Sequence, residues 1–205
     1  GVDVFSAAYQ ATVYYLPDTT GWGSSWNGRP TAVWNLPIAD ASATETWLVS
    51  ANGLNAAAVL DGSRSYDADG DVLEYFWFCS NSQPPTLLAT GVVATVVLPV
   101  GNNPVDLVVS DRVATTTNSI TVTVVTTGEA LHWLIALVDS SGLRNPKPLM
   151  ATLWAALGSI ERGNRAAAAN QLRAFQNKVQ AQVADPGLAR QLIEAAQKVI
   201  VAFES

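Results

Sequence analysis

The most informative segment of this 205-residue chain reads Leu60-Asp61-Gly62-Ser63-Arg64-Ser65-Tyr66-Asp67-Ala68-Asp69-Gly70-Asp71. Its four aspartates and two glycines are typical of a tight turn, because aspartate side chains hydrogen-bond to nearby backbone amides and glycine tolerates unusual backbone angles. Large apolar residues then alternate at Leu73, Tyr75 and Trp77, which is the period of a β-strand. The segment therefore predicts an aspartate-rich turn at the rim of a β-sandwich.

The same segment resembles the signature of polycystic-kidney-disease-type (PKD) domains, which are immunoglobulin-like modules of extracellular proteins. Three further strands are predicted at residues 92–100, 105–110 and 119–125, where β-branched runs are separated by Gly101-Asn102-Asn103-Pro104 and by a polar stretch. The resemblance implies an immunoglobulin-like β-sandwich over residues 38–126 that acts as a spacer. Many family members carry an aspartate-and-glycine-rich turn after the tryptophan, and this chain has residues 78–85 in its place.

Asp67, Asp69 and Asp71 offer carboxylate oxygens at alternate positions, and calcium prefers such hard oxygen ligands. Some PKD-type domains hold calcium through this turn. The resemblance implies Asp67 and Asp69 as ligands, together with an asparagine of the preceding loop, either Asn52 or Asn55. We therefore predict a calcium site formed by Asp67, Asp69, Asp71 and Asn55. The alternative is a metal-free turn in which Asp61, Asp67 and Asp71 cap backbone amides.

Residues 1–37 carry a second resemblance, in Val4-Phe5-Ser6, in the run from Ala11 to Pro17, and in the aromatic stretch that ends at Trp34. They look like the closing cap of BspA-type leucine-rich-repeat regions of bacterial surface proteins. This implies a cap remnant with a strand at residues 12–15. Trp22 and Trp26 are candidate ligand-binding residues because sugar rings stack on indole faces, and the alternative is that they only cover apolar surface.

From Gly128 onward the spacing of apolar residues changes from two to between three and four. Helices are predicted at residues 129–139, 146–162, 165–183 and 186–203. Asn145 and Asp185 each precede a proline and are expected to cap a helix, and Asn164 follows a glycine as a third cap. Short loops between these helices predict an antiparallel three-to-four-helix bundle over residues 129–205.

Residues 153–183 resemble FIVAR modules, which are small helical modules of bacterial extracellular proteins associated with binding of glycans or host surfaces. The resemblance implies a binding face on the helices. Asn170, Asn177 and Lys178 belong to a polar band that is a candidate ligand-binding surface, and a solvated helix face is the alternative.

The charge distribution argues against nucleic acid as a partner. Residues 1–128 hold 3 Lys/Arg against 11 Asp/Glu, and residues 129–205 hold 8 against 6, so neither half has the basic surface that phosphate binding requires. No apolar run reaches the roughly 18 residues of a membrane span, so membrane insertion is not expected. The only histidine, His132, has a single nearby acid in the sequence, Glu129 one turn earlier, and is expected to be a boundary residue rather than a general base; no nucleophile motif is present.

Together these features predict a non-catalytic binding or adhesion region of a bacterial secreted or cell-surface protein. The expected partner is a glycan or a surface protein. The alternative is a structural stalk or a self-assembling fibre subunit, in which exposed strand edges pair between copies.

Overall fold

The computed structural model describes residues 11–204, which form eleven strands and four helices. The strands are β1 (Val13–Tyr15), β2 (Ser25–Trp26), β3 (Arg29–Val33), β4 (Ser42–Ala43), β5 (Trp47–Ser50), β6 (Asn55–Asp61), β7 (Glu74–Cys79), β8 (Thr86–Thr90), β9 (Val93–Pro99), β10 (Gly101–Ser110) and β11 (Thr115–Thr126). The helices are α1 (Thr127–Ser140), α2 (Lys147–Glu161), α3 (Arg165–Gln182) and α4 (Pro186–Glu204). Within the described residues, all the strands precede Thr127 and all the helices follow Thr126.

Strands β1, β3 and β2 form a small sheet, here called the N-terminal sheet. β1 pairs with β3 in parallel and β2 pairs with β3 antiparallel, so β3 lies in the centre. The strand predicted at residues 12–15 appears as β1. The predicted cap also includes Val4-Phe5-Ser6, which lies outside the described residues.

Residues 38–126, here called the β part, contain two sheets that share one core. The larger sheet has the order β5-β11-β10-β7-β8 and the smaller has the order β4-β6-β9. Every second residue of β9 and β10 is buried, as expected for strands with one face on a core. The core combines residues of both sheets, including the fully buried Leu60, Leu98, Trp77 and Leu107.

Two glycines of the aspartate-rich segment have structural roles that explain the motif. A Cβ at Gly62 would lie 2.9 Å from the Cδ2 atom of the buried Leu107, so any other residue here would require a core side chain to shift. Gly70 has a φ of 81°, which is unfavourable for other residues. The turn is therefore held against the core at one end and is tightly bent at the other.

The prediction that Gly101-Asn102-Asn103-Pro104 is a turn is wrong, because these residues begin β10 and pair with residues 121–124 of β11. The buried Asn103 side chain donates hydrogen bonds to the carbonyls of Pro99, Gly101 and Val122. Pro104 cannot donate a backbone hydrogen bond, but its carbonyl accepts one from the Ser80 amide at 3.1 Å. Side-chain hydrogen bonding thus allows a sequence rich in turn formers to continue as a strand.

The four helices begin and end within about two residues of the predicted bounds, and together they form what we call the helical part (residues 127–204). Asn164 and Asp185 accept hydrogen bonds from the Ala167 and Leu188 amides and cap α3 and α4 as predicted. The predicted Asn145 cap is wrong, because Pro146 occupies the N-cap position of α2 and no side chain caps it. The fully buried Leu131, Leu153, Phe175 and Leu192 show that all four helices contribute to one core.

The β part and the helical part join without a loop. β11 ends at Thr126 and α1 begins at the next residue. Thr126 and Glu129 form a capping box, in which the Glu129 amide donates to Thr126 Oγ1 at 3.2 Å and the Thr126 amide donates to Glu129 Oε2 at 2.8 Å. A strand of the β part is therefore continued directly by a helix.

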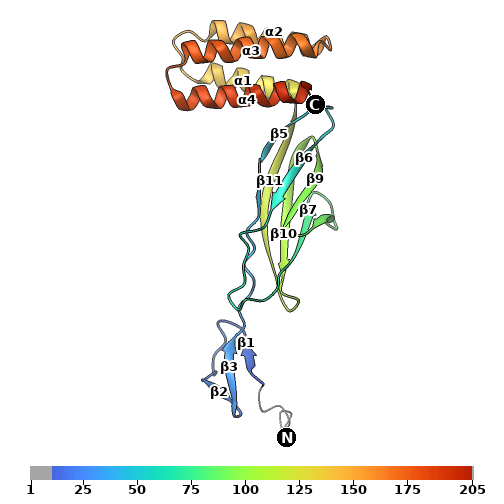
Figure 1. Cartoon of the computed structure of the whole chain (residues 1–205), viewed down its shortest axis with the longest axis vertical. Helices are drawn as coiled ribbons and strands as arrows, with labels where there is room; N and C mark the ends of the chain where they lie inside the picture. The colour runs from blue at the N-terminus through green and yellow to red at the C-terminus, as the bar shows by residue number, and fades with distance from the viewer. Residues whose placement is uncertain (1–10, 205) are drawn as a thin grey trace.

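The N-terminal sheet, the β part and the helical part follow one another along the long axis of the molecule, and the helices lie across the end of the β part (Figure 1). Each helix contacts the next, and α1 also contacts α4. Among the described residues, no helix has a long enough apolar stretch to cross a lipid bilayer. The architecture is thus a mixed β plus α chain with its helices at one end.

Candidate functional site

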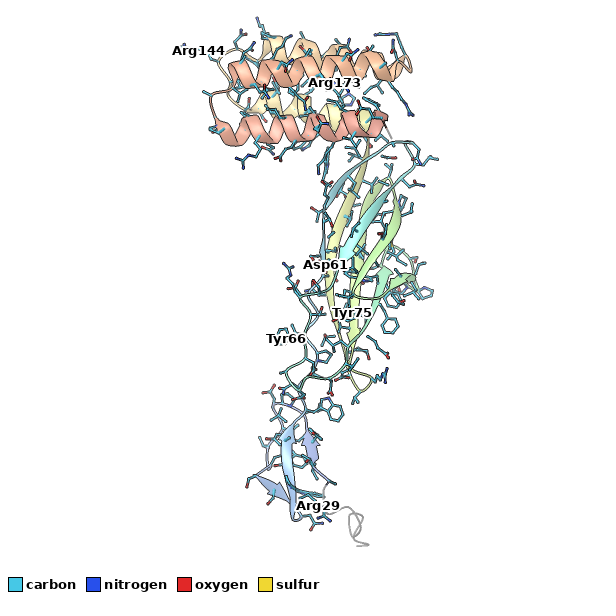
Figure 2. The ribbon with its side chains drawn as sticks, viewed as in Figure 1. Arg29, Asp61, Tyr66, Tyr75, Arg144 and Arg173 are labelled. Atoms are coloured by element: carbon cyan, nitrogen blue, oxygen red, sulfur yellow. The ribbon has the colours of Figure 1, made fainter. Side chains whose placement is uncertain are left out.

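The aspartate-rich turn follows the end of β6 and brings the three predicted carboxylates together. Ligand oxygens of Asp67, Asp69 and Asp71 lie within 4.8 Å of one another. Asp61 and Tyr66 mark the path of the turn, along which the chain approaches the N-terminal sheet (Figure 2). The spacing of the carboxylates suits one cation that is contacted by several oxygens.

The hydrogen bonds of the turn show which oxygens are already used. Asp67 Oδ1 accepts from the Asp69 amide at 2.7 Å, whereas Asp67 Oδ2 is buried and has no hydrogen-bond partner. Both oxygens of Asp69 accept hydrogen bonds from Asn35, one from its backbone amide at 2.7 Å and one from Nδ2 at 2.8 Å. The unpartnered oxygen of Asp67 and the exposed Asp71 fit a cation, while Asp69 also holds the segment that leads to the N-terminal sheet.

The structure does not bring Asn55 to this cluster. Asn55 is the first residue of β6, and the aspartates follow the last residue of that strand. The two ends of a seven-residue strand are about 20 Å apart. The Asn55 side chain instead accepts a hydrogen bond from Asn52 Nδ2 at 3.0 Å. The amide at the cluster is Asn35, 34 residues from Asp69, and no local pattern indicates it.

Two other aspartates near this rim are held as anions by backbone amides. The pKa of Asp61 is lowered, chiefly because the Ser63 amide donates to its carboxylate. The pKa of Asp111 is also lowered, first because the Ala114 amide donates to it at 2.6 Å, with smaller contributions from the Val113 amide and Trp34. Trp34 Nε1 donates to Asp111 at 3.2 Å, so this carboxylate also anchors the chain near the N-terminal sheet.

Of the two predicted sugar-stacking tryptophans, Trp26 lies in β2 of the N-terminal sheet and Trp22 lies in the loop between β1 and β2. Trp22 lies parallel to Tyr15 with a centroid separation of 5.1 Å and donates from Nε1 to Thr19 Oγ1. Trp26 is 45% exposed and lies 6.3 Å from Trp22 at a tilt of 53°. One face of Trp22 is thus occupied by Tyr15, while Trp26 remains accessible.

The polar band predicted as a binding face on α3 is divided in the structure. Lys178 donates to Thr152 Oγ1 at 2.6 Å and to the Pro148 carbonyl at 3.2 Å, which ties α3 to α2. Asn170 accepts from Arg173, which itself pairs with Glu204 of α4. Asn177 is exposed. Asn170 and Lys178 are thus engaged by other residues of the helical part.

A groove that the sequence did not indicate lies where β5 meets α1 and α4. It has a volume of about 510 Å³ and is lined by Trp47, Trp133, Gly187, Arg190, Gln191, Glu194, Ala195 and Lys198. Such a volume is within the range of about 300–1,000 Å³ found for small-ligand sites. Its walls come from positions far apart in the chain, so no sequence motif could reveal it.

Lys198 fixes one wall of this groove. Its ammonium donates to Glu45 Oε2 at 3.0 Å and to the Trp47 carbonyl at 3.1 Å, and it lies 5.6 Å from the centre of the Trp47 ring. These contacts join α4 to the β part. Lys198 of α4 therefore contacts both the backbone carbonyl and the ring of Trp47.

The single histidine lies on the outer surface of the helical part. His132 is exposed, its Nδ1 atom is 3.0 Å from the Gly128 carbonyl oxygen, and its ring meets Trp154 edge-on. Within the described residues, the side chains that lie close enough together to hold a metal ion are those of Asp67, Asp69 and Asp71. His132 is not among them.

A scan of the chain against protein-family models finds no match. A search of curated proteins likewise finds no match. Function is therefore inferred from the residues and their arrangement.

Proposed function

We propose that this chain is a non-catalytic binding or adhesion region of a bacterial surface or secreted protein, in which the β part spaces and the helical part binds a glycan or a surface protein. The observation that carries the proposal is the serial arrangement in Figure 1, with the helices across one end of the elongated molecule. In such an arrangement, a binding surface on the helices is held away from the N-terminal sheet. We therefore assign ligand binding, rather than catalysis, to the helical part.

The proposal takes the β part to be an immunoglobulin-like sandwich of the PKD type. Two features support it: a three-stranded sheet and a five-stranded sheet on one core, and the buried Trp77 in β7. Immunoglobulin-like sandwiches place their strands in two such sheets around a buried tryptophan. The resemblance of the aspartate-rich turn to the PKD signature is a third support for this assignment.

The proposal also takes the helical part to be an antiparallel bundle of the FIVAR type and the N-terminal sheet to be the remnant of a leucine-rich-repeat cap. Short connections between helices that contact one another in order support the bundle. The parallel pairing of β1 with β3 supports the cap, because strands of adjacent repeats run parallel in a solenoid. The proposed divisions are residues 1–37, 38–126 and 129–205.

Calcium at the aspartate-rich turn is part of the same proposal. Asp67, Asp69 and Asp71 would hold the ion, and the buried, unpartnered Asp67 Oδ2 is the atom that supports this assignment. A bound ion would supply positive charge that offsets the repulsion among the carboxylates. Since Asp69 also binds Asn35, the ion would stiffen the connection between the N-terminal sheet and the β part.

A fibre subunit is the alternative function, and one observation favours it. In the N-terminal sheet β1 pairs only with β3, so its other edge is available within the described residues for a strand of another copy. Strand addition at that edge would build an open assembly rather than a single module.

Sedimentation velocity over a wide dilution series distinguishes the two functions, when it is combined with binding assays on purified polysaccharides and purified surface proteins. A mass that stays monomeric at every concentration, with binding to one of these ligands, is the expected result. An assembly that grows with concentration and has no such ligand would contradict the binding module and support the fibre.

A further inference from the structure

The groove between β5, α1 and α4 combines aromatic and polar walls in a way that points to a ligand. The rings of Trp47 and Trp133 have centroids 5.7 Å apart and are tilted by 42°, and both side chains line the groove. Trp133 is 40% exposed, although it is one of the largest apolar side chains of α1. An indole left this accessible beside a second one provides a platform for the face of a flat ligand.

The polar wall comes from α4. Gly187 precedes Arg190 and Gln191 by three and four residues, and Glu194 follows them by four and three, so these lining residues share one side of the helix. Within residues 11–204, the structure gives no hydrogen bond or ion pair to the side chains of Arg190, Gln191 and Glu194.

These three side chains have different hydrogen-bonding abilities. Arg190 only donates, Glu194 as a carboxylate only accepts, and Gln191 does both. A ligand that satisfies all three must carry groups that both donate and accept. Hydroxyl groups have this property.

We propose that this groove binds a neutral pyranose unit of a glycan, with the sugar ring against Trp47 and Trp133 and its hydroxyls on Arg190, Gln191 and Glu194. The inference rests on the proposed binding function and gives it a place and a ligand class. The apolar C–H face of a pyranose packs on an indole, while the hydroxyls at its rim can replace the water around the exposed side chains of Arg190, Gln191 and Glu194. An open groove also accommodates a chain that continues beyond the bound unit.

The charges of the groove favour a neutral sugar over an anion. The two cations, Arg190 and Lys198, are balanced by Glu194 and by Glu45, which pairs with Lys198. A phosphate, a sulfate or a uronic acid would gain from Arg190 but would face the unpaired carboxylate of Glu194. A wholly apolar ligand would cover the polar side chains without satisfying them.

Isothermal titration calorimetry on the whole chain tests this inference, with short oligosaccharides of glucose, mannose and N-acetylglucosamine as neutral probes. A galacturonic acid oligosaccharide, inorganic phosphate and a proline-rich peptide serve as competing classes. We expect at least one neutral oligosaccharide to bind. The acidic sugar and phosphate should bind more weakly or not at all.

Trp133→Ala should weaken that binding by about tenfold or more, which corresponds to about 1.4 kcal/mol. Trp154→Ala is the matched control, because Trp154 is 51% exposed on the neighbouring helix α2 and does not line the groove. The Trp154→Ala variant should bind the oligosaccharide with the same affinity as the unmodified chain. Gln191→Ala, an exposed change on α4, should weaken binding several-fold and keeps the test valid if Trp133→Ala impairs folding.

Two results would overturn the groove assignment. Binding of neutral oligosaccharides that is unaffected by both Trp133→Ala and Gln191→Ala would place the glycan site elsewhere and leave the proposed binding function standing. Binding of none of the neutral probes, or of only the peptide or the anions, would refute the ligand class. If the chain in addition assembled into fibres, the proposed function itself would fail.

Discussion

The capping box at the junction of β11 and α1 provides a quantitative test of how the two parts are joined. Thr126→Ala removes the hydroxyl that accepts from the Glu129 amide at 3.2 Å and donates to Glu129 Oε2 at 2.9 Å. Loss of a threonine N-cap costs about 1 kcal/mol, within a range of about 0.5–2 kcal/mol. Glu129 is exposed and keeps its hydrogen bond from the Thr126 amide, so the lower half of that range is expected.

The assay is urea unfolding followed by circular dichroism, which reports on the helices. Thr127→Ala is the matched control, because it makes the same chemical change one residue later, at a helical position where alanine is favoured. We expect Thr126→Ala to lower the free energy of unfolding by about 0.5–1 kcal/mol and the melting temperature by about 1–4 °C. Thr127→Ala should leave both unchanged or slightly raised.

The effect should depend on pH in a defined direction. The pKa of Glu129 is lowered in the folded chain, chiefly by the hydrogen bond from the Thr126 amide and then by that from the Thr126 hydroxyl. A carboxyl group with a lowered folded pKa stabilises the protein above its unfolded pKa, and this contribution is lost as the pH falls through the folded pKa. The difference between Thr126→Ala and the unmodified chain should therefore shrink in acid. Equal stabilities at neutral pH, or a difference that grows in acid, would refute this account of the junction.

Four further outcomes are expected. Calcium at about 100 times its Kd should stabilise the chain by about 2.7 kcal/mol, and Asp69→Asn should reduce that gain; identical melting curves with calcium and with chelator would contradict the metal site. Lys178→Met should lower the free energy of unfolding by about 1–2 kcal/mol because it removes the hydrogen bonds between α3 and α2, whereas the exposed Lys147→Met should not, as measured in urea. Asp111→Asn should destabilise by about 1 kcal/mol at neutral pH, with a difference that disappears in urea titrations below the lowered pKa of Asp111; a constant difference would show that charge is not involved. Limited proteolysis should cut at residues 141–145, between α1 and α2, rather than at the continuous β11–α1 junction, and mass spectrometry of the fragments identifies the site.

The sequence predicted the helices well because their signals are local. Apolar spacing and the caps at Asn164 and Asp185 act within one or two turns of the chain. The Thr126–Glu129 box is equally local, a threonine followed three residues later by glutamate, and was open to prediction from the same signals. The failure at Gly101-Asn102-Asn103-Pro104 has the opposite cause, since long-range pairing with β11 overrides the turn preference of these residues.

The same distinction explains which parts of the candidate sites were foreseen. Asp67, Asp69 and Asp71 are close in sequence, so their spacing alone predicts that they cluster. Asn35 reaches Asp69 across 34 residues, and the groove joins Trp47 and Trp133 to α4. Such contacts arise only from tertiary packing, which a single sequence does not display.

The parallel pairing of β5 with β11 gives the molecule a mechanical property. The two strands are paired from Trp47 with Thr123 to Ser50 with Thr126, and they run in the same direction. Suppose that tension is applied to the N-terminal end of β5, at Trp47, and to the C-terminal end of β11, at Thr126. The two strands are then pulled in opposite directions along their length. The hydrogen bonds between them are then sheared together instead of being opened one after another. Once the contacts of residues 37–44 with the β part have opened, including the pairing of β4 with β6, the β5–β11 pair resists further stretching beside the junction of the sheet and the helices.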